Sequence, residues 1–367
     1  MCAAFRLLFV IVLVIASAGP TSARKKKGHT PPPRGPKRSA AEIEAATQLQ
    51  VFLDRANFSP GKLDGHYSDF TLKALALYRQ SRGEPVAPRP STPDTAPDLN
   101  GIDVGSVGPV FIQYTVTEAD LQNVGALPST VPEKAKLKAL LYRDVGEEVA
   151  ERFHCDEKFL GELNPGKNGA LKPGDQVKVP NVEPFELDAV KDLKPGSEIA
   201  PEAANDIPDE PEQKPNPNSE PMAAPKTSVK VDVKTNMLGV FEGDKIIAAY
   251  PVTVGSRQTT TPIGEWKVRG VAKLPTFRYD EQMLKHGQRS KNFRILSPGP
   301  NNPVGVVWIA LNKRGIGIHG TDDPNTIGQA VSHGCIRLAN WDVVRLAGKV
   351  KAGCRCQCIE ASTRGSG

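Results

Sequence analysis

Three proline-rich stretches interrupt this chain of 367 residues and limit the length of any one folded unit. Segments with many prolines and few large apolar side chains bury too little surface to fold, so we expect these stretches to be linkers. They occupy residues 24–40, 84–108 and 183–226, and the third is also acidic. The rest of the chain has room for two or three ordinary domains, which we place at residues 41–83, 109–182 and 227–361.

Residues 1–23 have the pattern of an export signal. Arg6 precedes an apolar run from Leu7 to Ala16, and small residues follow at 16–18 and 21–23, where a signal peptidase could cut. The apolar run is shorter than the roughly 20 residues that span a bilayer, although an uncleaved anchor is the alternative. We therefore expect an exported protein of the periplasm or cell wall, which meets the membrane only through this signal.

The net charge of +6 arises largely from seven basic residues between Arg24 and Arg38, with no acidic residue among them. Such a run is either a solvated tail or a contact for an anionic polymer. We interpret it as a tail and expect no nucleic-acid partner.

Chemically reactive residues gather in the last third of the chain. His319 and His333 precede Cys335, and a cysteine becomes a nucleophile when an imidazole takes its proton. The alternation before His319 predicts the end of a strand and residues 321–325 predict a loop, so the chain can return and bring His319 to Cys335. Gly334 lets the backbone approach a substrate carbonyl, and the amides of Gly334 and Cys335 could bind an oxyanion.

Two motifs carry a resemblance to a known family. They are His319-Gly320 with Ser332-His333-Gly334-Cys335-Ile336-Arg337, and Thr261-Pro262-Ile263-Gly264-Glu265-Trp266. Together they resemble the L,D-transpeptidase (YkuD-type) catalytic domain. The resemblance implies that Cys335 is the nucleophile and His319 its base, that the Gly320 carbonyl orients the imidazole, and that His333 helps to hold the tetrahedral intermediate.

The other members of the signature are expected at the substrate side of the site. Ser332 and Gly334 belong to the turn that would contact the oxyanion. Arg337 either holds a substrate carboxylate or braces the loop, and we favour bracing.

The reactive residues also have other interpretations. His319, His333 and Cys335 could bind zinc, or the cysteine could be structural. Three further cysteines, Cys354, Cys356 and Cys358, belong to a separate segment and alternate like buried residues of one strand, although a metal or redox role is the alternative. We therefore expect neither a metal nor a cofactor.

The remaining pattern of residues 227–361 predicts a mainly β sandwich. Alternating apolar residues predict strands at 229–233, 238–240 and 246–254, and an apolar run predicts a buried strand at 306–311. The polar stretch 274–303 is typical of a lid or binding loop. We expect Asn340 to cap a helix after Cys335.

The first predicted domain, residues 41–83, contains a pattern of two helices joined by a turn. Its motifs are Leu49-Gln50, Gly61 to Gly65, Thr71 and Ala74-Leu75. They resemble the peptidoglycan-binding type 1 domain, a small helical module. The chain departs from that family at Ser68, where glycine is usual, and at Arg79, where glutamine is usual.

The second predicted domain, residues 109–182, begins with a strand at 111–116 and ends with a strand at 177–180. Helices are predicted at 147–153 and 156–163, before a turn at 171–176. This segment resembles the LysM module, a βααβ unit that binds glycans containing N-acetylglucosamine. Residues 117–145 would then be an insertion between its first strand and first helix.

Taken together, the resemblances imply a peptidoglycan L,D-transpeptidase. Cys335 would form a thioester with a tetrapeptide stem and pass it to an amine acceptor, on a second stem or on an envelope protein. The expected partners are stem peptides and glycan strands. The alternatives are a thiol-dependent L,D-carboxypeptidase or endopeptidase, which would use the same residues, and a cell-wall-binding protein without catalysis.

Overall fold

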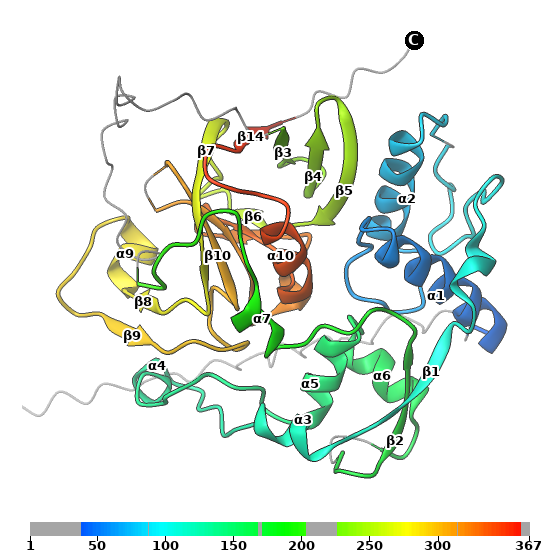
Figure 1. Ribbon diagram of the computed structural model, residues 1–367, viewed down its shortest axis with the longest axis horizontal. Coiled ribbons are helices and arrows are strands. Elements are labelled where there is room, and N and C mark those ends of the chain that lie inside the picture. The colour runs from blue at the N-terminus through cyan, green and yellow to red at the C-terminus, as the bar shows by residue number, and fades with distance from the viewer. Residues whose placement is uncertain (1–37, 87, 168–170, 203–225, 314, 361–367) are drawn as a thin grey trace, which may run out of the picture. The chain divides into compact units, whose positions relative to one another are not determined.

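The structure is a computed structural model that describes residues 38–86, 88–167, 171–202, 226–313 and 315–360 (Figure 1). The predicted export signal at 1–23 and nearly all of the basic linker lie outside these residues. No helix in the described part of the chain is long and apolar enough to cross a membrane.

Two helices form the first part of the described chain, α1 (Ala40–Arg55) and α2 (Asp69–Ser81). Ser39 and Glu42 make a reciprocal cap at the start of α1, and Ser68 accepts a hydrogen bond from the Thr71 amide at the start of α2. The buried side chain of Gln50 fixes the loop between the helices, because its amide donates to Asp64 and its carbonyl accepts from the Gly65 amide. Ser68, the departure from the resembled family, is thus a helix cap.

This helical part shares its apolar core with residues 226–360, which are called the catalytic segment here because the sequence predicts a catalytic domain there. Leu49 and Leu53 of α1 and Ala74 and Leu75 of α2 belong to one buried cluster with Met237, Ile246 and Ala249. The backbone also joins the two parts, since the Ser59 amide donates to the Ala249 carbonyl at 2.8 Å.

The segment expected to be a linker at 84–108 packs against the helices instead. The guanidinium group of Arg79 donates to the carbonyls of Asp98 and Asn100 at 2.9 and 3.1 Å. The segment ends in a short 3₁₀ helix, η1 (Val104–Val107), where Val107 is buried. These contacts use backbone carbonyls, which every residue has. The proline-rich composition of the segment therefore could not reveal them.

A second part of the fold is built on two antiparallel strands, β1 (Phe111–Thr115) and β2 (Gln176–Pro180). Two helices lie between them in sequence and pack on them, α5 (Val145–Arg152) and α6 (Glu157–Leu163). The predicted insertion holds two short helices, α3 (Glu118–Gln122) and α4 (Val131–Lys134). It docks on the catalytic segment, because the amide and carbonyl of Leu140 bond to Pro298 and Asn301.

The catalytic segment contains an eight-stranded mixed sheet, so the prediction of a mainly β domain is confirmed. Its strand order is β13-β11-β10-β7-β14-β3-β4-β5. Figure 1 labels β10, β7, β14, β3, β4 and β5 of this sheet. The bounds are β3 (Thr227–Asp232), β4 (Met237–Glu242), β5 (Lys245–Pro251), β7 (Gly264–Lys273), β10 (Val307–Leu311), β11 (Gly317–His319), β13 (Ile336–Arg337) and β14 (Arg355–Ile359).

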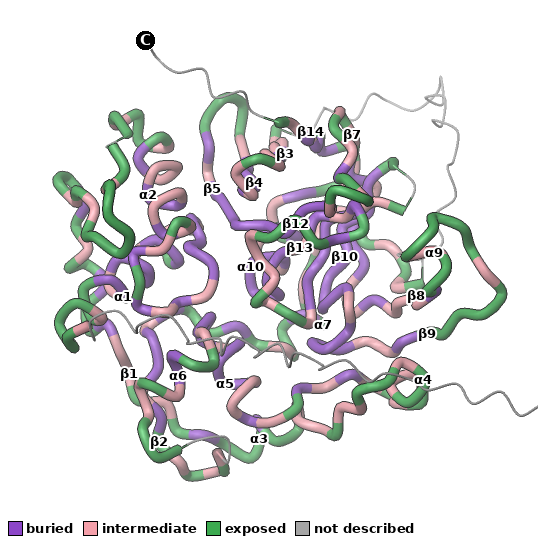
Figure 2. Tube along the Cα trace, turned by 180° about the vertical axis from the view of Figure 1, so that it is seen from behind, coloured by how far each residue is buried: buried purple, intermediate pink, exposed green. Residues whose placement is uncertain are grey.

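The long strand β7 makes this sheet curl. Its first half, residues 264–267, pairs with β14, and its second half, residues 268–273, pairs with β10. The two halves of the sheet therefore enclose one apolar core, which appears as the continuous buried region around β10 and β13 in Figure 2. Helix α10 (Asn340–Ala347) contributes Val343 and Leu346 to that core.

Smaller elements complete the catalytic segment. The pair β6 (Val254–Gly255) and β12 (Ala330–Ser332) lies beside the reactive residues, with the short helix η2 (Pro324–Thr326) before β12. The predicted lid at 274–303 contains β8 (Phe277–Tyr279), α9 (Glu281–His286) and β9 (Arg294–Leu296). Cys354, Cys356 and Cys358 are all buried, as the alternation predicted, and the last two lie in β14.

The prediction of an extended acidic spacer at 183–226 is wrong for residues 183–202. Phe185 and Val190 are buried in the catalytic core, and Val190 belongs to a short helix, α7 (Ala189–Asp192). Further on, the Ile199 amide donates to the Val271 carbonyl in β7. Isolated apolar residues in an acidic, proline-rich context anchor this segment, and residues 203–225 lie outside the described chain.

Residues from all three parts meet in a buried polar cluster. The carboxylate of Asp54 at the end of α1 lies 2.9 Å from Nδ1 of His154 and accepts a hydrogen bond at 2.9 Å from Arg345 in α10. Burial raises the pKa of Asp54, but His154 and Arg345 outweigh it and hold this pKa below its usual range. Asp54 is therefore an ionised carboxylate compensated by residues that lie 100 and 291 positions away.

Two further contacts extend this cluster. The Ser59 hydroxyl donates to the Asp342 carboxyl at 2.8 Å, and burial raises the pKa of Asp342 to about 7. The ring of His154 stacks on Trp341 with centroids 5.0 Å apart.

Candidate active site

The reactive residues lie in or next to the paired strands β11 and β13, at one edge of the sheet. The parallel register places Ile318 opposite Ile336 and His319 opposite Arg337. Because side chains alternate along a strand, the two isoleucines share one face and His319 shares the other with Cys335, which directly precedes β13. Ile318 and Ile336 are fully buried in the core, so this packing fixes the register that brings the imidazole and the thiol to the same face.

The imidazole of His319 is held in one orientation. Its Nδ1 lies 2.6 Å from the Gly320 carbonyl oxygen, so Nδ1 carries the proton and donates it to that oxygen. Its ring stacks on Trp308 of β10 with centroids 5.1 Å apart and an interplanar angle of 13°. Nε2 is therefore the nitrogen left to accept a proton, as the family resemblance implied for a base oriented by Gly320.

The pKa of His319 is lowered to about 3, chiefly by burial, with a further contribution from the positive charge of Arg337. The hydrogen bond to Gly320 acts in the opposite direction. At neutral pH the imidazole is thus uncharged and able to accept a proton.

The thiol of Cys335 is half-buried. Its Sγ lies 3.4 Å from the Gly315 carbonyl oxygen and packs against the apolar cluster that includes Trp308. Burial raises the pKa of Cys335, while a backbone hydrogen bond from Gly317 and the charge of Arg337 act to lower it. At neutral pH Cys335 is therefore a protonated thiol and His319 an uncharged imidazole.

The turn before Cys335 is closed by Ser332. This side chain is fully buried, and its hydroxyl donates to the Cys335 carbonyl at 2.6 Å and accepts from the Gly334 amide at 3.2 Å. Gly334 has a φ of 107°, a conformation that favours glycine. Its amide donates to the Ser332 hydroxyl, and the oxyanion role expected of the Gly334 and Cys335 amides stays a prediction. His333 is exposed on the same turn.

Arg337 follows the cysteine within β13. Its backbone pairs with Thr253, which ties the strand to the loop beside β6. Among the described residues its guanidinium forms no ion pair, and its buried Nε has no hydrogen-bond partner. Both predicted roles, bracing and holding a carboxylate, therefore stay predictions.

Two residues that support the site were not singled out as such from the sequence. Thr261, part of the Thr-Pro-x-Gly motif, donates to the Gly334 carbonyl at 3.0 Å and accepts from the Gly255 amide at 2.8 Å. Thr259 donates to the Ser332 carbonyl at 2.9 Å. The motif thus fixes the nucleophile turn through side chains about 73 positions away.

Asn340 supports the other side of the site and is not the helix cap that was predicted. It is the first residue of α10, whose cap position is Ala339. Its side chain accepts from the Val306 amide at 3.2 Å and donates to the Thr321 and Pro300 carbonyls at 3.2 and 3.3 Å. A Cβ atom on Gly320 would lie 2.2 Å from the Asn340 oxygen, so only glycine allows this close approach beside His319.

Within the described chain no three His, Cys, Asp or Glu side chains are arranged to hold a metal ion. His319 uses Nδ1 for the Gly320 carbonyl, and His333 is exposed.

Comparison with known proteins identifies the family of this part of the chain. The family model described as the L,D-transpeptidase catalytic domain (YkuD) matches residues 226–357. This segment is an L,D-transpeptidase catalytic domain. The resemblance found in the sequence is thereby confirmed for this domain and for its enzyme class, whereas the peptidoglycan-binding and LysM resemblances stay predictions.

Several bacterial relatives align with the L,D-transpeptidase domain. A Bacillus licheniformis protein named L,D-transpeptidase YkuD is 27% identical over 210 residues, which cover 57% of this chain and 90% of that protein. Bacillus subtilis YqjB is 35% identical and Escherichia coli YbiS 32% identical, covering 34% and 32% of this chain and 66% and 40% of those proteins. Both are named as L,D-transpeptidases.

Solved structures of the same enzyme class also align. L,D-transpeptidase 3 from Mycobacterium tuberculosis, in complex with a faropenem-derived adduct, is 17% identical with a TM-score of 0.31. The match covers 37% of this chain and 61% of that one.

Proposed function

We propose that this protein is an exported peptidoglycan L,D-transpeptidase that works through a thioester on Cys335. The observation that carries the proposal is the buried, uncharged imidazole of His319, whose Nδ1 is fixed on the Gly320 carbonyl and which shares a sheet face with Cys335. An uncharged imidazole with one free ring nitrogen can accept the proton of the thiol.

In the first half-reaction the sulfur attacks the amide carbonyl between the L-centre of a diamino acid and a terminal D-alanine. The thiol proton passes to Nε2 of His319 as the carbon–sulfur bond forms. The Cys335 amide stabilises the oxyanion, a contribution of about 3 kcal/mol for one such donor. The carbon–nitrogen bond then breaks, the imidazolium returns its proton to the leaving amine, and D-alanine departs.

In the second half-reaction an amine attacks the thioester. His319 takes a proton from this amine, and the sulfur leaves and is reprotonated as the new amide forms. The acceptor is an amine of a second stem or of an envelope protein. Water in the same position would make the enzyme a carboxypeptidase or endopeptidase, because every residue so far described is shared by that reaction.

The parts before the catalytic domain are proposed to hold murein. The βααβ arrangement of β1, α5, α6 and β2 supports a LysM-type glycan module, and a groove of about 510 Å³ on this part is lined by Gly161, Asn164 and Lys167. The α1–α2 part supports a peptidoglycan-binding module. Export to the periplasm or cell wall is proposed from residues 1–23 and is tested by deleting them and locating the protein by cell fractionation.

The reaction is tested by mass spectrometry of tetrapeptide muropeptides incubated with the wild type and with Cys335→Ala. Cross-linked product in the presence of an amine acceptor supports transfer, and tripeptide alone supports hydrolysis. Unchanged activity of Cys335→Ala contradicts the mechanism. A carbapenem adduct on the wild type, absent from the variant, would distinguish an enzyme from a binding protein.

A further inference from the structure

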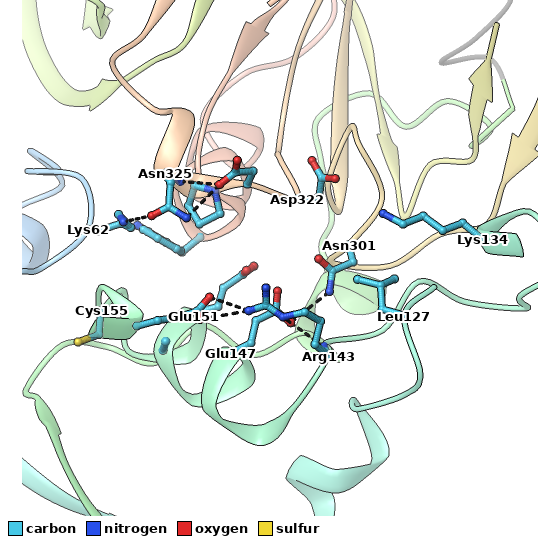
Figure 3. A pocket seen from close by; sticks show the side chains of 15 residues that line it. Lys62, Leu127, Lys134, Arg143, Glu147, Glu151, Cys155, Asn301, Asp322 and Asn325 are labelled. Carbon is cyan, nitrogen blue, oxygen red and sulfur yellow. Dashed lines mark hydrogen bonds and ion pairs between the residues drawn. The ribbon is translucent and has the colours of Figure 1, made fainter. Parts of the chain in front are cut away.

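A separate cavity of about 390 Å³ lies between α5 and the loop that follows His319 (Figure 3). Neither Cys335 nor His319 lines it. Its volume falls within the range of small-molecule sites and equals that of about a dozen water molecules. The lining is mainly polar, with side chains from the inserted second part on one wall and from the catalytic domain on the other (Figure 3).

A buried carboxyl of α5 faces this cavity without full compensation. Glu151 is 9% exposed, and among the described residues its Oε1 has no hydrogen-bond partner. Burial raises the pKa of Glu151 to about 8, and the neighbouring charges of Glu147 and Glu148 add to this effect. Hydrogen bonds from Asn340 and Tyr142 act in the opposite direction.

More carboxyl groups surround the same space. Burial raises the pKa of Glu147 as well, on the same wall as Glu151. Asp322 lies on the opposite wall, where burial raises its pKa while the charges of Lys134 and Arg337 oppose the shift. Carboxyl groups that resist ionisation because they are buried together are stabilised by a cation placed among them.

The basic residues of the cavity differ in what they contact. Arg143 pairs with Glu147 and Glu157, and Lys62 pairs with Asp156 outside the cavity. Lys134 forms no ion pair in the described part of the chain, and it projects toward Asp322 in Figure 3. One cation is therefore available for an anionic group of a ligand.

We propose that this cavity binds a ligand with a primary ammonium group and a carboxylate, with Glu151 accepting from the ammonium and Lys134 contacting the carboxylate. Free diamino acids and the ends of stem peptides both have this chemistry. The stem peptide as source rests on the proposed function, whereas the ammonium site itself does not.

The experiment is isothermal titration of the full chain carrying Cys335→Ala, so that no acyl transfer contributes heat. The probe is free diaminopimelic acid, and pimelic acid, which lacks both amines, is its matched comparison. We expect the diamino acid to bind at least ten-fold more tightly than pimelic acid. Equal affinities, or displacement of the diamino acid by calcium or magnesium, would overturn the proposal.

Variants locate the bound ammonium. Glu151→Gln keeps the shape of the side chain and removes its charge, and we expect roughly 10- to 100-fold weaker binding, as for the loss of one charge-assisted hydrogen bond. Glu118→Gln changes an exposed carboxylate of α3 that is outside the cavity and should leave affinity unchanged. Unaltered binding by Glu151→Gln would refute the assignment.

A second variant tests the site if Glu151→Gln does not fold. Lys134→Ala, at a less buried position, should weaken diaminopimelic acid binding but not the binding of 1,5-diaminopentane, which has no carboxylate. An equal effect on both probes would remove Lys134 from the site.

A proton count adds an independent readout. Glu151 is largely protonated at pH 7, so an ammonium that binds its ionised form must release a proton, seen as a dependence of the heat on buffer ionisation. Binding without proton release contradicts the role of Glu151.

Two ligands distinguish the sources. A tetrapeptide stem that binds more tightly than free diaminopimelic acid, and loses affinity when its side-chain amine is acetylated, identifies the stem. Tighter binding of the free amino acid identifies a small metabolite, and both results support the ammonium site. Binding is measured on the Cys335→Ala variant, whereas the proposed function is tested by the muropeptide assay of the wild type. A failure to bind would therefore refute the ammonium site without refuting the proposed function.

Discussion

Asn340 is expected to matter for catalysis although it is not one of the reacting groups. Its side chain joins the backbone at Val306, Pro300 and Thr321 by bonds of 3.2, 3.3 and 3.2 Å. Thr321 follows the Gly320 carbonyl that orients the base. The substitution Asn340→Ala would remove all three bonds, together with the hydrogen bond to Glu151, and leave a buried amide and two buried carbonyls unpaired.

The expected magnitude follows from these groups. An unsatisfied buried donor or acceptor costs about 1–3 kcal/mol, and some of the three will be rehydrated, so we expect a loss of roughly 2–4 kcal/mol in the free energy of unfolding. Displacing the imidazole by about 1 Å lowers the rate roughly 100-fold. We therefore expect kcat/KM to fall about 100-fold, with most of the effect in kcat.

The assay measures D-alanine release from a tetrapeptide muropeptide at a temperature at which circular dichroism shows the variant folded. Asn164→Ala is the matched control, since Asn164 also makes three side-chain hydrogen bonds to backbone, with Leu160 and Lys178, outside the catalytic domain. It should lose similar stability but keep kcat within about 3-fold, since an effect on the proposed glycan groove, which Asn164 also lines, would change KM. Full activity of Asn340→Ala, or an equal loss of kcat in both variants, would refute the reasoning.

Three further predictions follow from the same geometry. Burial lowers the pKa of His319 to about 3, so its neutral form persists as the pH falls. We therefore expect kcat/KM not to drop between pH 7 and about pH 5. A decrease in kcat/KM near pH 6.5 would show that the imidazole is solvated in the free enzyme. Thr261→Val, which keeps shape but loses its bonds to Gly255 and Gly334, should cost about 1–3 kcal/mol in urea unfolding and lower kcat, and the exposed Thr115→Val should do neither. Arg345→Ala leaves Asp54 buried without its cation and should lower stability by roughly 3–5 kcal/mol in denaturant unfolding, and a loss below about 1 kcal/mol would contradict the ion pair.

The sequence predicted the catalytic domain best, and for physical reasons. The strands at 229–233 and 306–311 have strong alternation or continuous apolar character, and both are present as β3 and β10. Cys335 and His319 could be named as candidates because a thiol and an imidazole are a common nucleophile and base, and their roles stay predictions. The expectation that Gly320 supplies a carbonyl to His319 came from the resemblance and agrees with the structure.

Support for the site could not be predicted in the same way. The bonds of Asn340 and Thr261 reach backbone groups distant in sequence, and no local pattern encodes a partner of that kind. Asn340 next to a helix start looked like a cap because asparagine is a common capping residue. Its amide is used instead to connect three loops.

The length of chain predicted to be unpacked linker was too large for a related reason. Composition indicates whether a segment can fold alone, but it says nothing of whether it can pack on a neighbour. Residues such as Val190 and Ile102 are few, yet they are buried against surfaces made by other parts of the chain.

The polar cluster of Asp54, His154 and Arg345 restricts how this protein can be divided or recombined. A catalytic fragment that begins at residue 227 would expose Arg345 and one face of Trp341 to water. A fragment of the first helices alone would leave the Asp54 carboxylate without its ion-pair partner Arg345. A chimaera with a foreign targeting module would therefore have to import Asp54 and His154 together with it. The three parts must therefore be engineered as one set.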